Sequence, residues 1–394
     1  MAVDLNALPA ALDLPHAPNL RHWCLVVLLC SVLAGVLVAV FWPSTGWQSS
    51  SWFWCCASIL PLATGGALYG LRHHSYEKHR DYVLGWNLNH EEQKRVLVDK
   101  AQRPIVILDA AYRTGAGNHQ VAALLASGSE ALRSLPGAGE QVRASPLPDS
   151  GAVAQQQNAE RLAVYLADIL IELETVLARY QQNASLKVRI RHDPSTGQEE
   201  ILSVWHACRG AQAIQDCVGF APLDDGLLWL DAWLDEAQPC GLVLSLEFNL
   251  FLKPVADQAE SVTAILLATP EWCVRHGATA KAFIHRPVKM ADMQVGLDTS
   301  LHWGRITEES RVNRVWHSQL SSDYLADLSI AARVAAGLPS SHNWLALDKS
   351  FGLPACTVGN IALILASEQA RTDGRAQLVL LQDASPQACV VQPA

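Results

Sequence analysis

One stretch near the carboxyl end decides the fold, and its residues are Trp344-Leu-Ala-Leu-Asp-Lys349-Ser350-Phe-Gly-Leu-Pro354-Ala-Cys-Thr-Val-Gly359-Asn-Ile-Ala-Leu363. Residues 343–347 predict a short extended segment, and residues 357–370 predict a helix. A strand that is followed closely by a helix is the unit from which α/β folds are built.

Strands and helices alternate through the preceding and following residues as well. Strands are predicted at 104–113, 188–192, 200–205, 241–248, 262–269, 377–381 and 388–392. Helices are predicted at 120–135, 158–180, 227–233 and 324–336. This alternation predicts an α/β fold with a mostly parallel sheet that is covered by helices. No internal sequence repeat is evident.

The quoted stretch resembles the lysine-serine, glycine-histidine segment of β-ketoacyl synthases, which belong to the thiolase superfamily. Lys349 and Ser350 match that segment, whereas Leu353 and Pro354 occupy the glycine and histidine positions. Residues 378–391 are similar to the final β-hairpin of the family, and residues 104–114 to its first strand. The resemblance implies a thiolase-like layered α/β fold over residues 104–394.

The same resemblance implies that the family's activity is lost. Residues 217–248 have the helix-then-strand layout that follows the family's nucleophilic cysteine, but Asp216 and Val218 depart from the usual surroundings of that cysteine. Condensation also needs an imidazole to stabilise the developing oxyanion, and Pro354 has no side-chain donor. We therefore expect no catalytic residues, and Cys217 and Lys349 are the candidates if the chain is an enzyme. Lys349 has two open roles, a structural salt bridge or a ligand contact.

Other motifs predict no cofactor and no metal. The sequence has no nucleophile elbow, zinc-protease motif, Walker loop or kinase signature. Gly115-Ala-Gly117 lacks the third glycine of a dinucleotide loop and predicts a turn. The histidines of the body are not paired with a nucleophile by any spacing, and the cysteines after residue 200 stand singly, without the spacing of a zinc site.

Two apolar segments precede the α/β body, at residues 23–42 and 52–71. Each has about the 20 residues that a helix needs to cross a membrane, and neither contains a charged side chain. We expect both to span. The alternatives are a signal peptide, although the first segment lacks a small-residue cleavage site, and a buried core hairpin. The second segment, which contains Pro61, Gly65 and Gly66, has the further alternative of a re-entrant or tilted helix.

The charges that flank these segments predict their orientation. Residues 43–51 carry no charge, whereas Arg21 precedes the first segment and Arg72, Lys78 and Arg80 follow the second. The positive-inside rule therefore places both ends of the hairpin in the cytoplasm. The predicted parts are a cytosolic tail (1–22), a transmembrane hairpin (23–71), a juxtamembrane helix and linker (72–103) and the α/β domain (104–394).

The net charge of −9 argues against a nucleic-acid partner. Anionic lipid headgroups are sufficient to explain the basic residues beside the second segment. The unpaired cysteines of the body indicate reduced thiols, which agrees with a cytosolic location.

A degenerate thiolase-like body behind a membrane segment resembles the membrane-anchored adaptors of type VI secretion, which hold a lipase effector for the secreted spike. The resemblance implies a protein effector, and also a spike protein, as partners at the inner membrane, and homodimerisation is a further expectation. One alternative is a membrane-bound acyltransferase that uses Cys217 with His302 or His342; another is an immunity or regulatory protein. A protein-binding role requires an exposed aromatic or apolar patch, for which the candidates are Trp272, Trp303, Trp316 and Trp344.

Overall fold

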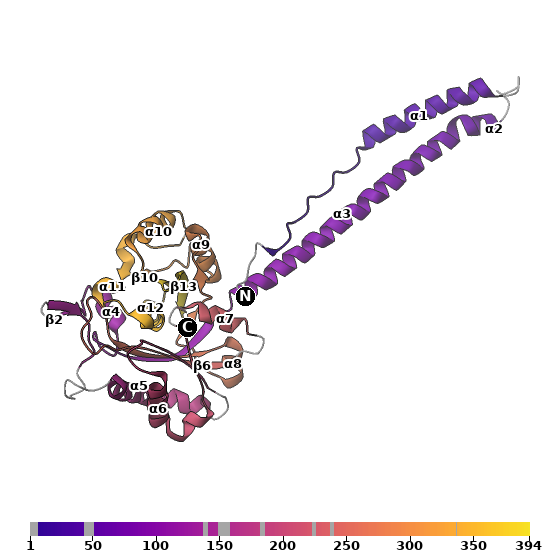
Figure 1. The fold of residues 1–394 in the computed structure, drawn as a ribbon. Helices are drawn as coiled ribbons and strands as arrows, with labels where there is room; N and C mark the ends of the chain where they lie inside the picture. The colour runs from indigo at the N-terminus through magenta and orange to yellow at the C-terminus, as the bar shows by residue number, and fades with distance from the viewer. Residues whose placement is uncertain are drawn as a thin grey trace. The chain divides into compact units, whose positions relative to one another are not determined.

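The structure is a computed structural model of the chain, and it describes residues 7–42, 51–136, 141–148, 158–181, 186–222, 226–236, 240–335 and 337–394. Two compact units are present, one comprising Asp4–Leu97 and the other continuing from Val98 to Ala394. Figure 1 shows the helical amino-terminal unit and the layered body. The predicted loop between the two apolar segments, at 43–50, lies outside the described residues.

The amino-terminal unit consists of helices. They are α1 (Leu20–Phe41), α2 (Ser51–Trp54), the π-helical segment Cys55–Ile59 and α3 (Leu60–Ala101). By length and composition, Leu20–Phe41 and the helix that begins at Ser51 could each cross a membrane. The predicted second span and the predicted juxtamembrane helix lie in one continuous helical run, because no residue between 60 and 101 breaks it.

Close contacts hold α1 against the start of α3. The rings of Trp23 and Tyr69 have centroids 6.0 Å apart. A Cβ added at Gly65 would lie 2.6 Å from a methyl carbon of Val27, so the glycine is what allows the two backbones to approach here. The π-helical segment ends just before Pro61, a residue that cannot donate a helical hydrogen bond to the preceding turn.

The body is built on one eleven-stranded sheet, with strands in the order β11-β10-β12-β13-β8-β1-β7-β6-β4-β5 and β9 paired to β13. The bounds are β1 Ile105–Thr114, β4 Lys187–His192, β5 Cys217–Phe220, β6 Leu242–Asn249, β7 Ser261–Ala268, β8 Ala282–Ile284, β9 Val288–Lys289, β10 Arg314–Ser318, β11 Trp344–Ala346, β12 Gln377–Gln382 and β13 Pro386–Pro393. A separate hairpin pairs β2 (Arg133–Pro136) with β3 (Gln141–Ala144).

The sheet consists of two halves with the same topology. One half has the order β1-β7-β6-β4-β5 and the other β8-β13-β12-β10-β11, and β1 pairs antiparallel with β8 between them. In each half the fourth strand of the order pairs in parallel with both of its neighbours, β4 with β5 and β6, and β10 with β11 and β12. The duplication is therefore present in the topology although no repeat is evident in the sequence.

The prediction of a mostly parallel sheet is wrong. The pairs β1–β7, β6–β7, β12–β13 and β8–β13 are antiparallel, so the sheet is mixed. Two of these pairs, β6–β7 and β12–β13, join consecutive strands through short connections. Such connections permit antiparallel pairing, whereas a parallel pair needs a long crossover.

Helices cover the sheet in layers (Figure 1). The bounds are α4 Val121–Ala126, α5 Asn158–Gln181, α6 Gln198–Arg209, α7 Leu228–Leu234, α8 Pro270–His276, α9 Met293–Trp303, α10 Ser322–Val334, α11 Leu347–Ser350 and α12 Val358–Asp373. Helices α5, α6 and α8 share a core with the first half of the sheet, and α9 and α10 share one with the second. Helix α12 contributes to a core with strands from both halves, and 12 of its 16 residues are buried, so it is an interior helix.

The predicted strand at 200–205 is wrong, because these residues belong to α6. Glu200 accepts a hydrogen bond from the backbone amide of Gly197, which closes the first turn of the helix. Ile201 and Trp205, four residues apart, are its buried residues. The strands predicted at 104–113, 188–192, 241–248 and 262–269 are confirmed, as is the helix at 158–180.

Candidate functional site

The structure places the two candidate catalytic residues in different halves of the sheet. Cys217 is the first residue of β5, the strand at one edge, and its side chain is exposed. Lys349 lies in α11, which directly follows β11, the strand at the opposite edge. The exposed His302 and His342, in α9 and in the 3-10 turn before β11, belong to the half of Lys349. No hydrogen bond or ion pair among the described residues joins Cys217 to these three side chains.

Pro354 and the residues around it form a turn that leads into α12. Gly352 has φ +99°, a value that favours glycine, and the Leu353 amide donates to the Asp257 carbonyl at 2.7 Å. The carbonyl of Pro354 accepts hydrogen bonds from the Thr357 amide at 3.0 Å and from its hydroxyl at 2.7 Å. In the family that this segment resembles, the segment carries a catalytic histidine. In this chain it forms the turn that leads into α12.

The first turn of α12 is occupied by a buried carboxylate. Glu247, on β6, accepts from the Asn360 amide at 2.9 Å and from Arg189 Nη1 at 3.0 Å. The guanidinium of Arg189 also lies over the ring of Trp229, 4.5 Å from its centroid. Ser245 donates to the side chain of Asn360. Sequence reasoning missed this cluster, and the available signal was the glutamate inside the apolar strand β6.

The start of helix α7 is closed in a related way. The amide of Leu227 donates to Gln387 Oε1 at 2.7 Å, and a Cβ added at Gly226 would lie 2.4 Å from the side-chain nitrogen of Gln387. Helix amino termini otherwise attract anions and developing negative charge. In this chain, side chains from the sheet already bind the amino-terminal ends of α12 and α7.

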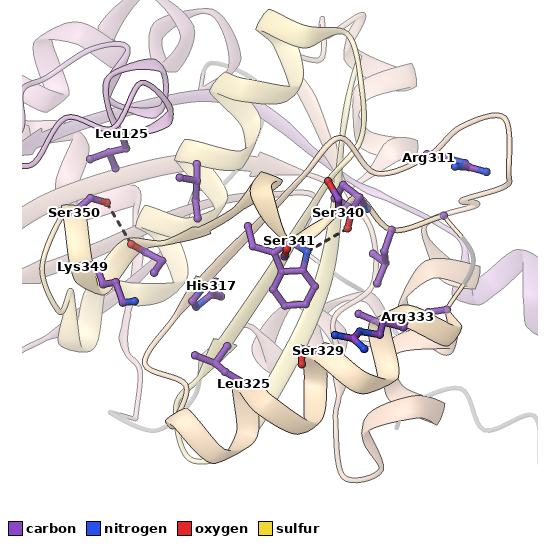
Figure 2. A pocket seen from close by; sticks show the side chains of 18 of the residues that line it. Leu125, Arg311, His317, Leu325, Ser329, Arg333, Ser340, Ser341, Lys349 and Ser350 are labelled. Carbon is purple, nitrogen blue, oxygen red and sulfur yellow. Dashed lines mark hydrogen bonds between the residues drawn. The ribbon is translucent and has the colours of Figure 1, made fainter.

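The body has a cavity of about 880 Å³ at the edge of the sheet where β11 lies. Figure 2 shows it between α10, which carries Leu325, Ser329 and Arg333, and the segment that carries Lys349 and Ser350. Leu125, from α4, also lines the cavity, on the side of Ser350. The volume is within the range of small-molecule sites, about 300–1,000 Å³.

The structure brings Lys349 and His317 together in this cavity. Burial, and then the charge of Lys349, lowers the pKa of His317 to about 4, so the imidazole is neutral near pH 7. Asp348 faces away, toward the end of β10: it accepts from Ser318 Oγ at 2.5 Å and from the Gln319 amide at 2.7 Å. Burial raises the pKa of Asp348.

The lining of the cavity carries more positive than negative charge. Its ionisable side chains, besides His317, are Lys349, Arg311, Arg333 and Glu308. Arg311 Nε donates to the carbonyl of Glu308 at 3.1 Å. Within the described part of the chain, neither Lys349 nor Arg333 has a carboxylate within salt-bridge distance. The salt-bridge role for Lys349 is therefore not observed.

Three of the four tryptophans that were candidates for an exposed patch are instead packed in the core. Trp272, Trp303 and Trp316 are 6%, 3% and 0% exposed and pack in the core. Trp344 is half-buried, lines the cavity, and donates its indole hydrogen to the Pro339 carbonyl at 3.4 Å. Among the described residues no group of histidine, cysteine and carboxylate side chains could hold a metal ion.

Comparisons of the structure with solved structures identify the fold. The ketosynthase complex AntDE:AntF aligns with a TM-score of 0.54 at 11% identity, over 74% of this chain and 99% of that chain. A β-ketoacyl synthase from Burkholderia phymatum aligns with a TM-score of 0.54 at 10% identity, over 74% of this chain and all of that chain, 100%. The ishigamide ketosynthase/chain length factor aligns with a TM-score of 0.52 at 12% identity, over 74% and 99%.

The body therefore has the thiolase-like ketosynthase fold, as the resemblance of residues 344–363 implies. No protein-family model and no curated protein sequence matches the chain. At sequence identities of 10–12%, these alignments show a similarity of fold alone.

Proposed function

We propose that the chain is a non-catalytic adaptor that is tethered to the bacterial inner membrane and holds a lipase-like effector for loading onto the type VI secretion spike. The observation that carries the proposal is how the residues at the positions expected for catalysis are arranged in the body. Glu247 occupies the first turn of α12, Pro354 stands at the histidine position, and Cys217 lies at an edge of the sheet away from Lys349. A ketosynthase-like body without a converging nucleophile and base is suited to binding and not to condensation.

The tether is proposed from the two apolar helices. Leu20–Phe41 and the helix from Ser51 are long enough to cross a bilayer, and the basic residues Arg72, Lys78 and Arg80 follow the second apolar segment. These charges favour a cytoplasmic location for the body. The secretion role itself rests on the resemblance to membrane-anchored effector adaptors. Homodimerisation is compatible with the proposal, and the stoichiometry of the purified complex tests it.

The test is affinity purification of the tagged full-length protein from mildly solubilised membranes, followed by mass spectrometry. The control is residues 1–100 with the same tag, which keeps the membrane segments and lacks the body. We expect the full-length protein, and not the control, to capture a lipase-like protein and a spike component. Light scattering of the purified complex gives its stoichiometry.

Two outcomes would overturn the proposal. One is the absence of a protein partner together with an acyl group on Cys217 that is lost in Cys217→Ser, which would support the acyltransferase alternative. The other is a captured lipase whose activity the chain blocks, which would support an immunity protein.

A further inference from the structure

The sheet of the body has an edge strand at β11, and the cavity lies beside it. Strand β11 pairs with β10 on one side and with no described strand on the other. An edge strand presents unpaired N–H and C=O groups on its open side. The three residues of β11 are all half-buried, and all three line the cavity. A chain that entered the cavity would therefore lie beside these backbone groups.

The lining of the cavity comes from both faces of the sheet at this edge. Leu325 and Trp344 pack with the core that contains α9 and α10. Leu345 packs with the core that contains α12, and Leu125 belongs to that core. Successive side chains of a strand point to opposite faces of a sheet. A strand added beside β11 would therefore place its side chains alternately against these two sets of residues.

The cations of the lining are separated from one another. Figure 2 shows Lys349 and Arg333 on opposite sides of the cavity, with Leu325 between them. One anionic group cannot meet both side chains, whereas an extended chain can present a different carboxylate to each. The described lining holds a single acidic residue, Glu308, against Lys349, Arg333 and Arg311. Charge complementarity therefore favours an acidic chain.

We propose that β11 and the cavity beside it bind an extended acidic segment of a partner protein, which pairs with β11 as an added strand. Its carboxylates contact Lys349 and Arg333 at separate positions, and its apolar side chains pack against Trp344 and Leu325. Because β11 has only three residues, main-chain hydrogen bonds alone would bind weakly, and the side-chain contacts supply the specificity. A second copy of β11 would bring the same cations to this edge, so charge disfavours it. The surface deepens the adaptor proposal and rests on it for the identity of the partner.

The test uses the full-length protein in nanodiscs of phosphatidylcholine and needs no effector. Short random peptides displayed on phage are selected on these nanodiscs, after the peptides that bind empty nanodiscs have been removed. We expect enrichment of peptides that combine aspartate or glutamate with β-branched residues. The most enriched peptide is then the probe, and fluorescence anisotropy measures its affinity.

Methylation of the probe's backbone nitrogens separates strand addition from simple binding in a groove. Methyl groups on every second nitrogen block hydrogen bonding along one edge of an extended peptide and leave the other edge intact. One set of methylated positions should weaken binding about tenfold or more, whereas the set shifted by one residue should retain it. An equal effect of the two sets would overturn the proposal. This comparison needs no protein variant, so it does not depend on how a substitution affects folding.

Matched protein variants test the role of the cavity. Lys349→Glu and Arg333→Glu should each weaken binding of the probe about tenfold, because each replaces an attraction by a repulsion. Lys253→Glu and Arg275→Glu make the same change at exposed positions elsewhere on the body and should leave the affinity unchanged. Ser329→Trp, at an exposed lining residue, should fill the cavity and abolish binding.

Three further results would overturn this site. They are the absence of any enriched acidic peptide, unchanged binding of the probe by all three lining variants, and a dimer in light scattering that Ser329→Trp dissociates, since a second copy would then occupy the edge. Effector capture that persists in the lining variants would remove the site and leave the adaptor proposal in place. Peptide binding at β11 without effector capture would retain the site and overturn the adaptor proposal.

Discussion

Arg189 Nη1 donates a 3.0 Å hydrogen bond to Glu247 Oε1 inside the body, where the carboxylate side chain is fully buried and that of Arg189 is 9% exposed. The two residues lie on β4 and β6, strands that pair in parallel. The same carboxylate accepts from the first turn of α12 at Asn360. One buried pair therefore joins the sheet to the interior helix.

Glu247→Gln should destabilise the chain strongly, because it leaves the charge of Arg189 buried without its partner. We expect a loss of about 3–5 kcal/mol in the free energy of unfolding. Urea titration followed by tryptophan fluorescence measures it. The matched control is Glu236→Gln, at the surface pair with Lys187, where both side chains are 42% exposed and the expected cost is about 1 kcal/mol or less. Equal shifts in the two variants would contradict the structural role of the buried pair.

Asp235 should make the stability of the body depend on pH in the acid range. Burial by itself would raise the pKa of Asp235, but hydrogen bonds and charges from Arg286 and Lys100 lower it to about 2. The ionised form is therefore favoured by folding, and its contribution is present above about pH 4 and lost as the pH falls toward 2. The loss should amount to about 2 kcal/mol.

The measurement is the unfolding midpoint as the pH falls from about 5 to about 2, a window that follows from the ordinary and the lowered pKa of the carboxyl. At the upper end of this pH range, Asp235→Asn should be less stable than the unaltered chain. As the pH is lowered, its stability should fall less than that of the unaltered chain. Asp327→Asn, at an exposed position on α10, is the control and should follow the unaltered chain. Parallel curves for all three proteins would show that Asp235 does not carry the effect.

His317 should titrate well below an ordinary histidine, with a pKa of about 4 that is set first by burial and then by Lys349. Because the folded pKa is lowered, stability should fall as the pH drops from the ordinary histidine range toward about 4. Lys349→Met should raise the pKa of His317 and leave it below the ordinary value, since burial remains. Selective histidine labelling and NMR titration of the ring carbon measure both values, with Lys253→Met as the control. An unchanged pKa in Lys349→Met would show that the two groups are not coupled.

The thiols should differ sharply in reactivity. Cys217 is exposed, whereas Cys356 and Cys389 are buried, and burial raises the pKa of both thiols. Iodoacetamide followed by peptide mapping should label Cys217 in the folded protein and the other two after denaturation. Rapid labelling of Cys389 under native conditions would contradict its place in the core, and the denatured sample controls for peptide recovery.

Local pattern was enough to predict much of the body. The amphipathic stripe of α5 and the apolar runs of β1, β6 and β7 each carry their own periodicity, and these elements are confirmed. The strand prediction at 200–205 covers only part of α6, and that window is too short to show that Ile201, Val204, Trp205 and Cys208 recur with helical spacing. A short apolar pattern fits both periods, and tertiary packing decides between them.

The residues of the candidate site also divide into those that can be recognised from their neighbours in the sequence and those that only the structure brings together. Lys349 was found from the residues around it, which match a known segment, and Pro354 was recognised as a departure from that segment. His317 and Arg333 could not be paired with Lys349, because the three residues belong to β10, α10 and α11 and no spacing relates them. For Trp272, Trp303 and Trp316 the structure decided in favour of core packing over an exposed patch, because an indole ring can serve in either place and the residue type alone does not separate the two.

By itself the sequence determined the class of the body, the two apolar helices before it and the presence of a proline at position 354, since each of these depends on residues that are neighbours along the chain. The tertiary structure alone decided that the sheet is mixed and duplicated, that Glu247 closes the first turn of α12, and that Lys349 lies beside His317 in a cavity. The physical reason is that strand order and buried ion pairs arise from contacts between segments far apart in sequence. Such contacts form where burial and hydrogen bonding are satisfied together, and local periodicity does not encode which segments will meet.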